Sequence, residues 1–200
     1  AADSIGLVRY QTIDEIGDAC EMNNLVSISS SLIEIKNKLP EERRVGKPYV
    51  RDYLIEIGQY IKSRTKVDGA DKPKIIITSL VRSRVDQNRI CEPKKIWQRV
   101  RGKIRHYFID GRSFADCSTD AVCSTHLTGA AVDIEIPANK LERKLLTERL
   151  LSDRDNGRIF VIVENFGNHF HAFILPPRYQ VIGMEKMPKN ILYLSRTSTQ

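Results

Sequence analysis

Two apolar runs near the C-terminus, at residues 158–164 and 169–175, constrain the fold most strongly. Between them stands the sequence Asn165-Phe166-Gly167-Asn168, whose residue types are typical of a tight turn. The two runs therefore predict a β-hairpin. Because side chains alternate between the two faces of a strand, His169 and His171 are expected to lie on the same face.

The rest of the chain predicts helices and strands in an α+β arrangement. Helices are expected at residues 25–39, 49–63, 85–101 (interrupted near Pro93) and 141–151. Strands are expected at residues 74–80 and 131–136, and a long polar loop at residues 111–124. We expect an antiparallel sheet with flanking helices, in which residues 1–45 form a helical arm packed on a core of residues 46–200.

The net charge suits an anionic partner. The 200 residues include 32 Lys and Arg against 25 Asp and Glu, which gives a formal charge of +7. Nucleic acid, an acidic lipid surface or a cell-wall polymer would fit this charge, and so would simple solubility. Basic residues are dense only from Lys94 to Arg105. Trp97 is the one aromatic residue in this stretch, which is too few for a surface that stacks on bases. We therefore expect no nucleic-acid partner. No apolar run approaches the ~18 residues of a membrane span, so we expect no transmembrane segment.

The four cysteines favour an exported protein. Cys117 and Cys123 flank a short polar loop that a disulfide could close, and Cys20 and Cys91 remain as a possible second pair. The start, Ala1-Ala2-Asp3-Ser4, lacks the features of a signal peptide and fits either a mature end left after export or a cytosolic start whose Met has been removed. We expect a periplasmic or cell-envelope location, with four reduced thiols in a cytosolic protein as the alternative.

Three of the four histidines lie in two short motifs that together could hold a zinc ion. The segment from residue 124 to 133 contains His126 and Asp133, and the hairpin adds two imidazoles on one face. A catalytic zinc uses three protein ligands, keeps one position for water and needs a general base nearby. One hairpin histidine is expected to be a ligand, while the other histidine, or Glu164, would move protons.

A second metal arrangement stays open at this point. Cys117, Cys123 and His126 include a Cys-x-x-His spacing, which could ligate a structural zinc together with one further thiolate. The sequence shows no clear fourth ligand for such a site. His106 lies outside both motifs and fits a structural or surface role.

The order of these residues resembles a known peptidase family. Residues 124–133 carry the pattern S-x-H-x-x-G-x-A-x-D, and an H-x-H pattern follows at residues 169–171. Both are similar to patterns of the zinc metallopeptidases of the D-alanyl-D-alanine carboxypeptidase and hedgehog-like fold, which include bacterial enzymes that cleave peptidoglycan stem peptides. Upstream, Thr78-Ser79-Leu80-Val81-Arg82-Ser83 looks like the family motif S-G-Y-R-S, with Leu80 and Val81 in place of Gly and Tyr. The resemblance covers residues 74–175.

The resemblance implies a role for each matched residue. The zinc ligands would be His126, Asp133 and His171. His169 would orient the attacking water or shuttle its proton, and Arg82 would bind a carboxylate or carbonyl group of the substrate peptide. Ser79 and Gln87 would belong to the same substrate-binding region.

One position departs from the family pattern. Many relatives place a catalytic Glu three residues before the last ligand, where this chain has Asn168. Glu164 lies seven residues before His171, across the turn from His169, so the general base is open between Glu164 and His169. We expect residues 46–200 to form a zinc peptidase-like domain that acts on peptidoglycan peptides. A non-catalytic, metal-stabilised binding domain on the same fold is the alternative.

Overall fold

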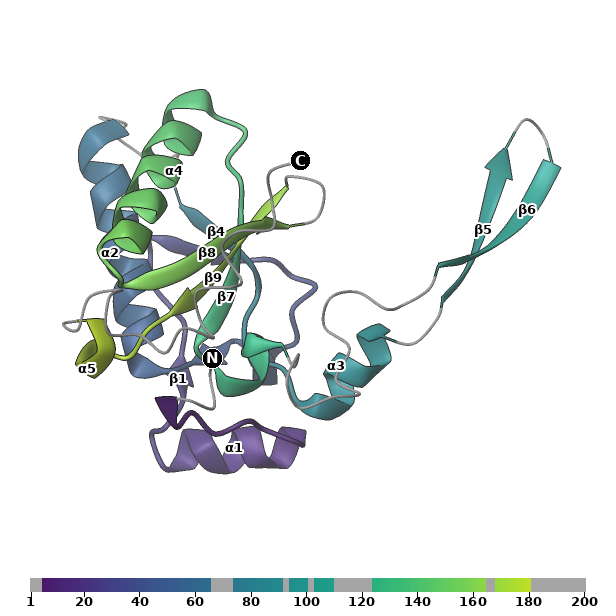
Figure 1. Cartoon of the computed structure of the whole chain (residues 1–200), viewed down its shortest axis with the longest axis horizontal. Helices are drawn as coiled ribbons and strands as arrows, with labels where there is room; N and C mark the ends of the chain where they lie inside the picture. The colour runs from purple at the N-terminus through teal and green to yellow at the C-terminus, as the bar shows by residue number, and fades with distance from the viewer. Residues whose placement is uncertain are drawn as a thin grey trace.

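A mixed five-stranded sheet forms the centre of the protein (Figure 1). The structure is a computed structural model, and it describes residues 5–65, 74–91, 94–100, 103–109, 124–164 and 168–180. In spatial order the strands of the sheet are β2 (Ile33–Ile35), β4 (Ile75–Ser79), β7 (Ala131–Glu135), β9 (His169–Ile174) and β8 (Ile159–Glu164). β2 runs parallel to β4, and the other neighbours are antiparallel.

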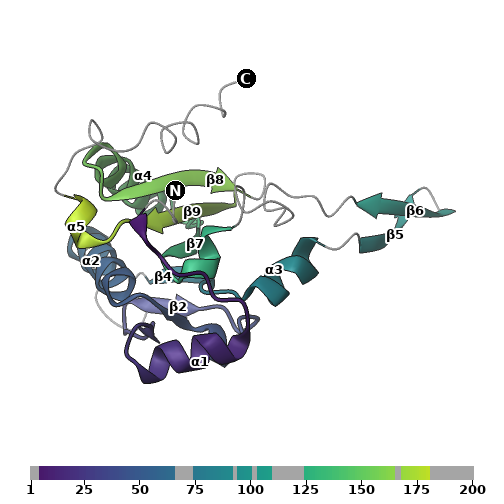
Figure 2. The ribbon, with the colours of Figure 1, turned by 60° about the horizontal axis from the view of Figure 1, so that its bottom comes forward.

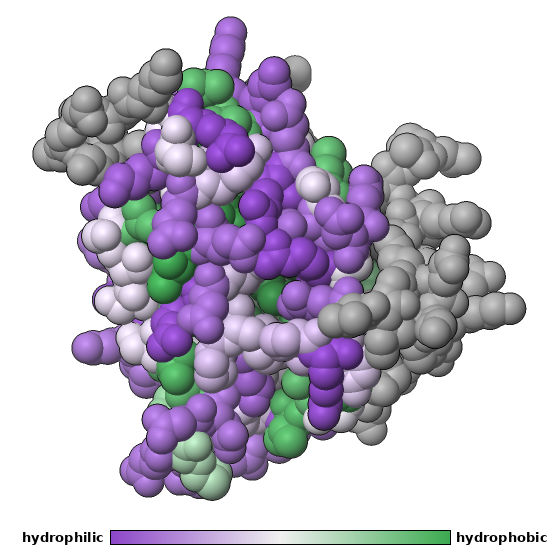
Figure 3. Space-filling view, turned by 90° about the vertical axis from the view of Figure 1, so that its left-hand side faces the viewer, coloured by the Kyte–Doolittle hydropathy of each residue, from purple (hydrophilic) through white to green (hydrophobic). Residues whose placement is uncertain are grey.

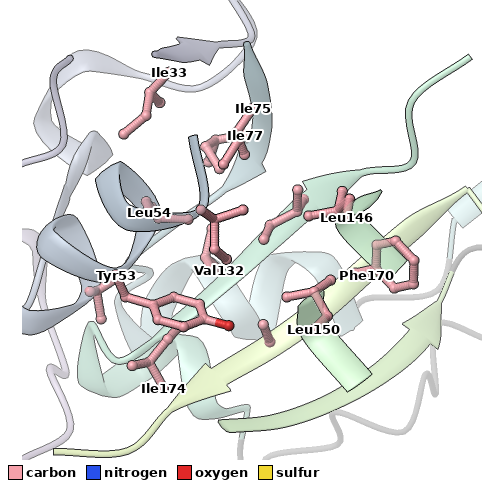
Figure 4. Close-up of a cluster of buried hydrophobic side chains, with 14 of the residues drawn as sticks. Ile33, Tyr53, Leu54, Ile75, Ile77, Val132, Leu146, Leu150, Phe170 and Ile174 are labelled. Carbon is pink, nitrogen blue, oxygen red and sulfur yellow. The ribbon is translucent and has the colours of Figure 1, made fainter. Parts of the chain in front are cut away.

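Helices α2 (Pro48–Thr65) and α4 (Lys140–Asp155) cover one face of this sheet (Figures 1 and 4). Apolar residues at helical spacing give each helix one apolar stripe, which packs on the strands. Asn139 begins α4, because its side-chain oxygen accepts hydrogen bonds from two backbone N–H groups. The core between helices and sheet includes Tyr53, Leu54, Ile57, Leu146, Leu150, Ile75, Ile77, Val132, Ile134, Phe170 and Ile174.

The opposite face of the sheet carries the polar residues of the two motifs. Strand pairing places Asp133 beside His171, and His169 beside Glu164, on this face. At one end of the face, α5 (Pro177–Gln180) and the N-terminal segment cover a small apolar cluster that contains Ile5, Ala130, Ala131, Phe173 and Leu175. One side of the strands is therefore a helix-covered core, and the other side carries the polar residues of the two motifs.

The helix predicted at residues 25–39 is wrong. That segment contains two short strands instead, β1 (Val26–Ser27) and β2. Ser30 gives a local reason, because its hydroxyl accepts a hydrogen bond from the backbone N–H of Leu32 and competes with helical bonding. The apolar residues of this segment, which suggested one side of a helix, are instead buried in two different hydrophobic clusters.

The helix of the N-terminal segment lies earlier in the chain. α1 spans Ile13–Glu21, and Thr12 caps it by accepting a hydrogen bond from the backbone N–H of Glu15. β1 pairs antiparallel with β3 (Val45–Gly46), while β2 belongs to the central sheet. The described part of the predicted arm thus contributes a strand to the main sheet, and a boundary at residue 45 stays a prediction.

The helix predicted at residues 85–101 is correct only in its first part. α3 spans Arg84–Cys91, and β5 (Lys94–Val100) follows it. Pro93 has no backbone N–H with which to continue a helix, and the β-branched and aromatic residues after it favour a strand. β5 pairs antiparallel with β6 (Lys103–Ile109) in a two-stranded ribbon that extends away from the central sheet (Figure 2).

The α+β class and most other predicted elements are confirmed. They are the helices at 49–63 and 141–151, the strands at 74–80 and 131–136, and the C-terminal hairpin. The sheet is not purely antiparallel, because the crossover through α2 lets β2 and β4 run parallel. Cys20 forms no disulfide with the side chains that the structure describes, and the side chain of Cys91 is not among them. Cys117 and Cys123 lie outside the described residues, as does almost all of the predicted polar loop. Both disulfides stay predictions.

A charged cluster ties α2 to α4 and to the start of β8. Glu56 forms ion pairs with Arg149 and Arg158. Asp153 pairs with the same two arginines at 2.7 Å and 2.9 Å, and it accepts a hydrogen bond from Tyr53 at 3.0 Å. The hydrogen bond from Arg158 contributes most to lowering the pKa of Glu56 to about 2. The molecular surface seen from the side of these helices is mostly hydrophilic (Figure 3).

We expect Glu56→Gln to flatten the acid dependence of stability. A carboxylate whose pKa is lowered by folding stabilises the protein fully above its unfolded-state pKa, and this stabilisation is lost as the pH falls to the folded-state value. For Glu56 the window runs from 4.5 down to about 2. Urea unfolding across this window should show a smaller decrease in unfolding free energy for the variant than for the wild type. Glu148→Gln, at a more exposed carboxylate of α4, is the control, and equal slopes for Glu56→Gln and wild type would contradict this role.

Candidate metal centre

Three side chains from separate elements converge on the open face of the sheet. His126 lies in η4 (Thr125–Thr128), a 3-10 helix, while Asp133 lies in β7 and His171 in β9. Their potential ligand atoms all lie within 4.8 Å of one another. Asp133 and His171 are direct cross-strand partners, and η4 leads straight into β7. The resulting cluster could bind a metal ion.

The residues between His126 and Asp133 allow the chain to turn from η4 into β7. Gly129 ends η4 with a φ of 68°, a left-handed conformation that favours glycine. A Cβ at this position would also lie 2.6 Å from Leu25 Cδ2. Ala131 is buried in the apolar cluster at the end of the sheet. Gly129 and Ala131 thus allow His126 and Asp133, which are seven residues apart in the chain, to reach the same centre.

The main chain fixes the orientation of His126. Its Nδ1 lies 2.7 Å from the carbonyl oxygen of Leu80, and because a carbonyl only accepts hydrogen bonds, Nδ1 carries a proton. His126 is 2% exposed, and this burial lowers its pKa to about 4, so the ring is neutral at neutral pH. The lone pair of Nε2 therefore faces Asp133 Oδ1, which is 3.1 Å away.

Asp133 Oδ1 also contacts the second imidazole, because His171 Nδ1 lies 2.8 Å from it. Burial alone would raise the pKa of Asp133, but the imidazoles of His126 and His171 outweigh this effect and hold the pKa well below its usual range. The carboxylate is therefore ionised. Its oxygen and the Nε2 of a neutral His126 are both acceptors, so a metal ion bound between them would satisfy both.

These donors fit a zinc ion. Imidazole nitrogens and carboxylate oxygens bind zinc at about 2.0–2.2 Å, which places the ligands of a tetrahedral site roughly 3.4 Å apart. The nitrogen–oxygen separations of 2.8 Å and 3.1 Å are shorter than that value, so the side chains would move apart by a few tenths of an ångström to hold the ion. The rings of His126 and His171 meet at 72°, with centroids 4.8 Å apart. The His126 side chain is 3% exposed and that of His171 is 16% exposed, so with respect to the described residues the centre is more accessible to solvent on the His171 side.

Arg82 brings the predicted substrate-binding residues to the edge of this centre. Its Nη2 donates to Ser79 Oγ at 2.6 Å and approaches Asp133 Oδ2 at 3.5 Å. Its Nη1 donates to Gln87 Oε1 at 3.2 Å. A β-bulge between Ile77 and Ser79 shifts the strand register and places Ser79 on the face of Asp133. One hydrogen-bond network therefore links all three predicted residues to a metal-ligand candidate.

A second ion pair lies behind Arg82. Arg43, at the end of η2 (Glu41–Arg43), contacts Asp86 Oδ1 at 2.5 Å, and Ser83 donates to Asp86 Oδ2 at 2.7 Å. Burial and, more weakly, the charge of Arg43 lower the pKa of Arg82. The sequence analysis missed Arg43 and Asp86, because partners 43 residues apart leave no local pattern.

His169 and Glu164 lie one step along the sheet from the ligand candidates. His169 is the cross-strand partner of Glu164 on β8 and of Glu135 on β7, so the three form a row beside the centre. The charge of Glu164 also acts on the guanidinium of Arg82. Both predicted proton-transfer residues are thus near the three donors without belonging to them.

Thr125 is a further neighbour that the sequence analysis missed. Its hydroxyl lies 2.9 Å from His171 Nε2, on the outer side of the ring. Its position inside the S-x-H motif was the only available signal. The alternative zinc arrangement needs Cys117 and Cys123, which lie outside the described residues, so that hypothesis stays a prediction.

Comparisons with known proteins identify no relative. A scan against protein-family models, a search of curated proteins and a search of solved structures each gave no match to this chain. The motif resemblance therefore depends on the residues quoted above and on the geometry that they adopt. Within the part of the chain that the structure describes, no helix has both the length and the apolar character needed to cross a membrane.

We expect the protein to bind one zinc ion per chain. Chelator-treated protein that is reloaded and desalted should contain one equivalent by elemental analysis. Its melting temperature should rise with zinc, since the ion binds the folded state. His126→Ala and Asp133→Ala each remove a donor and should lose the ion, whereas His106→Ala, outside both motifs, should keep it. Full zinc content in His126→Ala would refute the centre.

Proposed function

We propose that this protein is a zinc-dependent peptidase that hydrolyses peptidoglycan stem peptides. The observation that carries the proposal is a three-donor centre that is open on one side and has a guanidinium at its edge. His126, Asp133 and His171 supply the donors, and Arg82 contacts Asp133 with a side chain that is 20% exposed. Three protein ligands and an open position are typical of catalytic rather than structural zinc sites.

The motif resemblance supports the same proposal. Besides the two ligands, the S-x-H-x-x-G-x-A-x-D pattern contains Ser124, whose hydroxyl accepts a hydrogen bond from the backbone N–H of His126 at 3.3 Å. Gly129 ends η4 between the two ligand candidates, and Ala131 begins β7 with its side chain in the small apolar cluster. On this ground we assign the α+β fold to the D-alanyl-D-alanine carboxypeptidase and hedgehog-like group. A substrate in the cell wall places the enzyme outside the cytoplasm, in the periplasm or cell envelope.

The residues around the centre supply substrate binding. Zinc, when bound there, would activate water and polarise the scissile carbonyl. Arg82 would bind a carboxylate or carbonyl oxygen of the peptide, because its planar guanidinium offers several donors at once. Ser79 and Gln87 accept hydrogen bonds from two nitrogens of this guanidinium and so hold its orientation. Preorganised donors of this kind stabilise the charge that develops on the carbonyl oxygen.

Glu164 and His169 would move protons during hydrolysis. As cross-strand partners at the end of the hairpin, they share the face of the ligand candidates. Peptide hydrolysis needs one group that takes a proton from the attacking water and one that gives a proton to the leaving amine. A carboxylate and an imidazole side by side can fill both roles, and the order in which they act is open between them.

We expect the zinc-loaded protein to cleave muropeptides that contain D-amino acids. Chelation should abolish cleavage, and added zinc should restore it, with products identified by mass spectrometry. Arg82→Lys should keep the zinc content but raise KM, because a lysine cannot form the planar two-point contact with a carboxylate. Intact muropeptides after incubation with the zinc-loaded wild type would refute the proposal.

Glu164→Gln and His169→Ala separate a peptidase from a binding domain. In a peptidase, loss of the general acid or base should lower kcat by about 10²- to 10⁴-fold while the bound zinc remains. The control is Glu148→Gln on α4, which should keep wild-type kcat. A binding domain would instead bind muropeptides, as measured by calorimetry, without turnover in any variant. This alternative needs to be measured because Asn168 stands where many members of the family have a catalytic Glu.

A further inference from the structure

The two imidazoles of the centre face different kinds of outer partner. His126 Nδ1 faces the carbonyl of Leu80, which can only accept a hydrogen bond. His171 Nε2 faces the hydroxyl of Thr125, which can either donate or accept. The carbonyl therefore permits a single tautomer of a neutral ring, whereas the hydroxyl permits both.

This difference matters when a metal ion binds. In the absence of a metal, His171 Nδ1 lies 2.8 Å from a carboxylate oxygen of Asp133, and that contact needs a proton on Nδ1. A nitrogen that ligates a metal carries no proton. If Nδ1 becomes the ligand atom, the proton must leave it, and a neutral ring must take one up at Nε2. His126 needs no such change, because its proton is already on the outer nitrogen.

We propose that Thr125 is a positioning residue that lets His171 change tautomer on metal loading without losing its outer hydrogen bond. Its hydroxyl donates to Nε2 in the metal-free centre and accepts from Nε2–H in the metal-loaded one. One proton leaves Nδ1 for solvent and one joins Nε2 from solvent, so the charge of the ring is unchanged. This inference deepens the proposed zinc site and rests on it.

The structure holds the Thr125 hydroxyl in place for this task. The backbone carbonyl of Thr125 accepts a hydrogen bond from Thr128 Oγ1 at 2.7 Å, within η4. The same short helix carries His126, whose backbone carbonyl accepts from the N–H of Arg82 at 3.2 Å. The Thr125 hydroxyl and the His126 ring are therefore both supplied by one turn of chain. Groups that orient a ligand histidine in this way affect metal affinity, with losses of about 10- to 100-fold when they are removed.

Thr125→Val tests the inference, because it removes the hydroxyl and keeps the branched shape. Thr125→Ser keeps the hydroxyl and serves as the rescue. Thr78→Val is the matched control, since its hydroxyl donates to the backbone carbonyl of Asp133 at 3.3 Å and contacts no imidazole among the side chains that the structure describes. The zinc Kd, measured by competition with a chelator, should rise about 10- to 100-fold in Thr125→Val and stay near the wild-type value in the other two.

Histidine ¹⁵N chemical shifts, recorded with and without zinc, provide the second readout. The wild type should show His171 protonated at Nδ1 without zinc and at Nε2 with zinc, while His126 stays protonated at Nδ1. An unchanged Kd in Thr125→Val, or one His171 tautomer in both wild-type states, would overturn the inference. If Thr125→Val does not fold by circular dichroism, the wild-type tautomers still decide. Failure of the wild type to bind zinc is a separate outcome, which refutes the metal centre and the proposed function.

Discussion

One carboxylate oxygen organises the centre. Asp133 Oδ1 is within hydrogen-bonding distance of two imidazoles, and the cross-strand pairing of Asp133 with His171 puts it there. A buried anion is costly unless it is compensated, and Arg82 touches only its other oxygen, at 3.5 Å. A slip of one residue between β7 and β9 would turn the ligands toward the helices. The sheet register and the candidate metal centre are therefore specified by the same pairing.

The apolar side of the same strands secures that register. Val132 and Ile134 flank Asp133, Phe170 and Ala172 flank His171, and all four are buried in the core under α2 and α4. Full burial of a large aliphatic or aromatic side chain contributes about 1.5–3 kcal/mol. A register slip would expose these groups and bury charged ones instead. Core packing thus gives the ligand candidates the rigid frame that a metal site requires.

The sequence could predict what depends on neighbours in the chain. The turn residues between two apolar runs indicated the hairpin, and alternation indicated the shared face of its two histidines. The motif resemblance implied three ligand candidates, which the structure brings within 4.8 Å of one another. The helix expected at residues 25–39 was wrong because β1 and β2 depend on pairing with β3 and β4, far along the chain. The Arg43–Asp86 pair escaped notice for the same reason. The contact of Thr125 with His171 needs the β7–β9 pairing before it can be seen.

The N-terminal segment is joined to the centre through main-chain bonds. The backbone N–H of Tyr10 donates to the carbonyl of Leu127 in η4 at 2.8 Å, and the carbonyl of Tyr10 accepts from Arg84 at 3.0 Å. β2, from the same segment, covers one side of β4. A shortened chain beginning at residue 46 would leave β4 with an unpaired edge, open to strand addition by another molecule. A chain shortened in this way would thus be prone to aggregate through that edge.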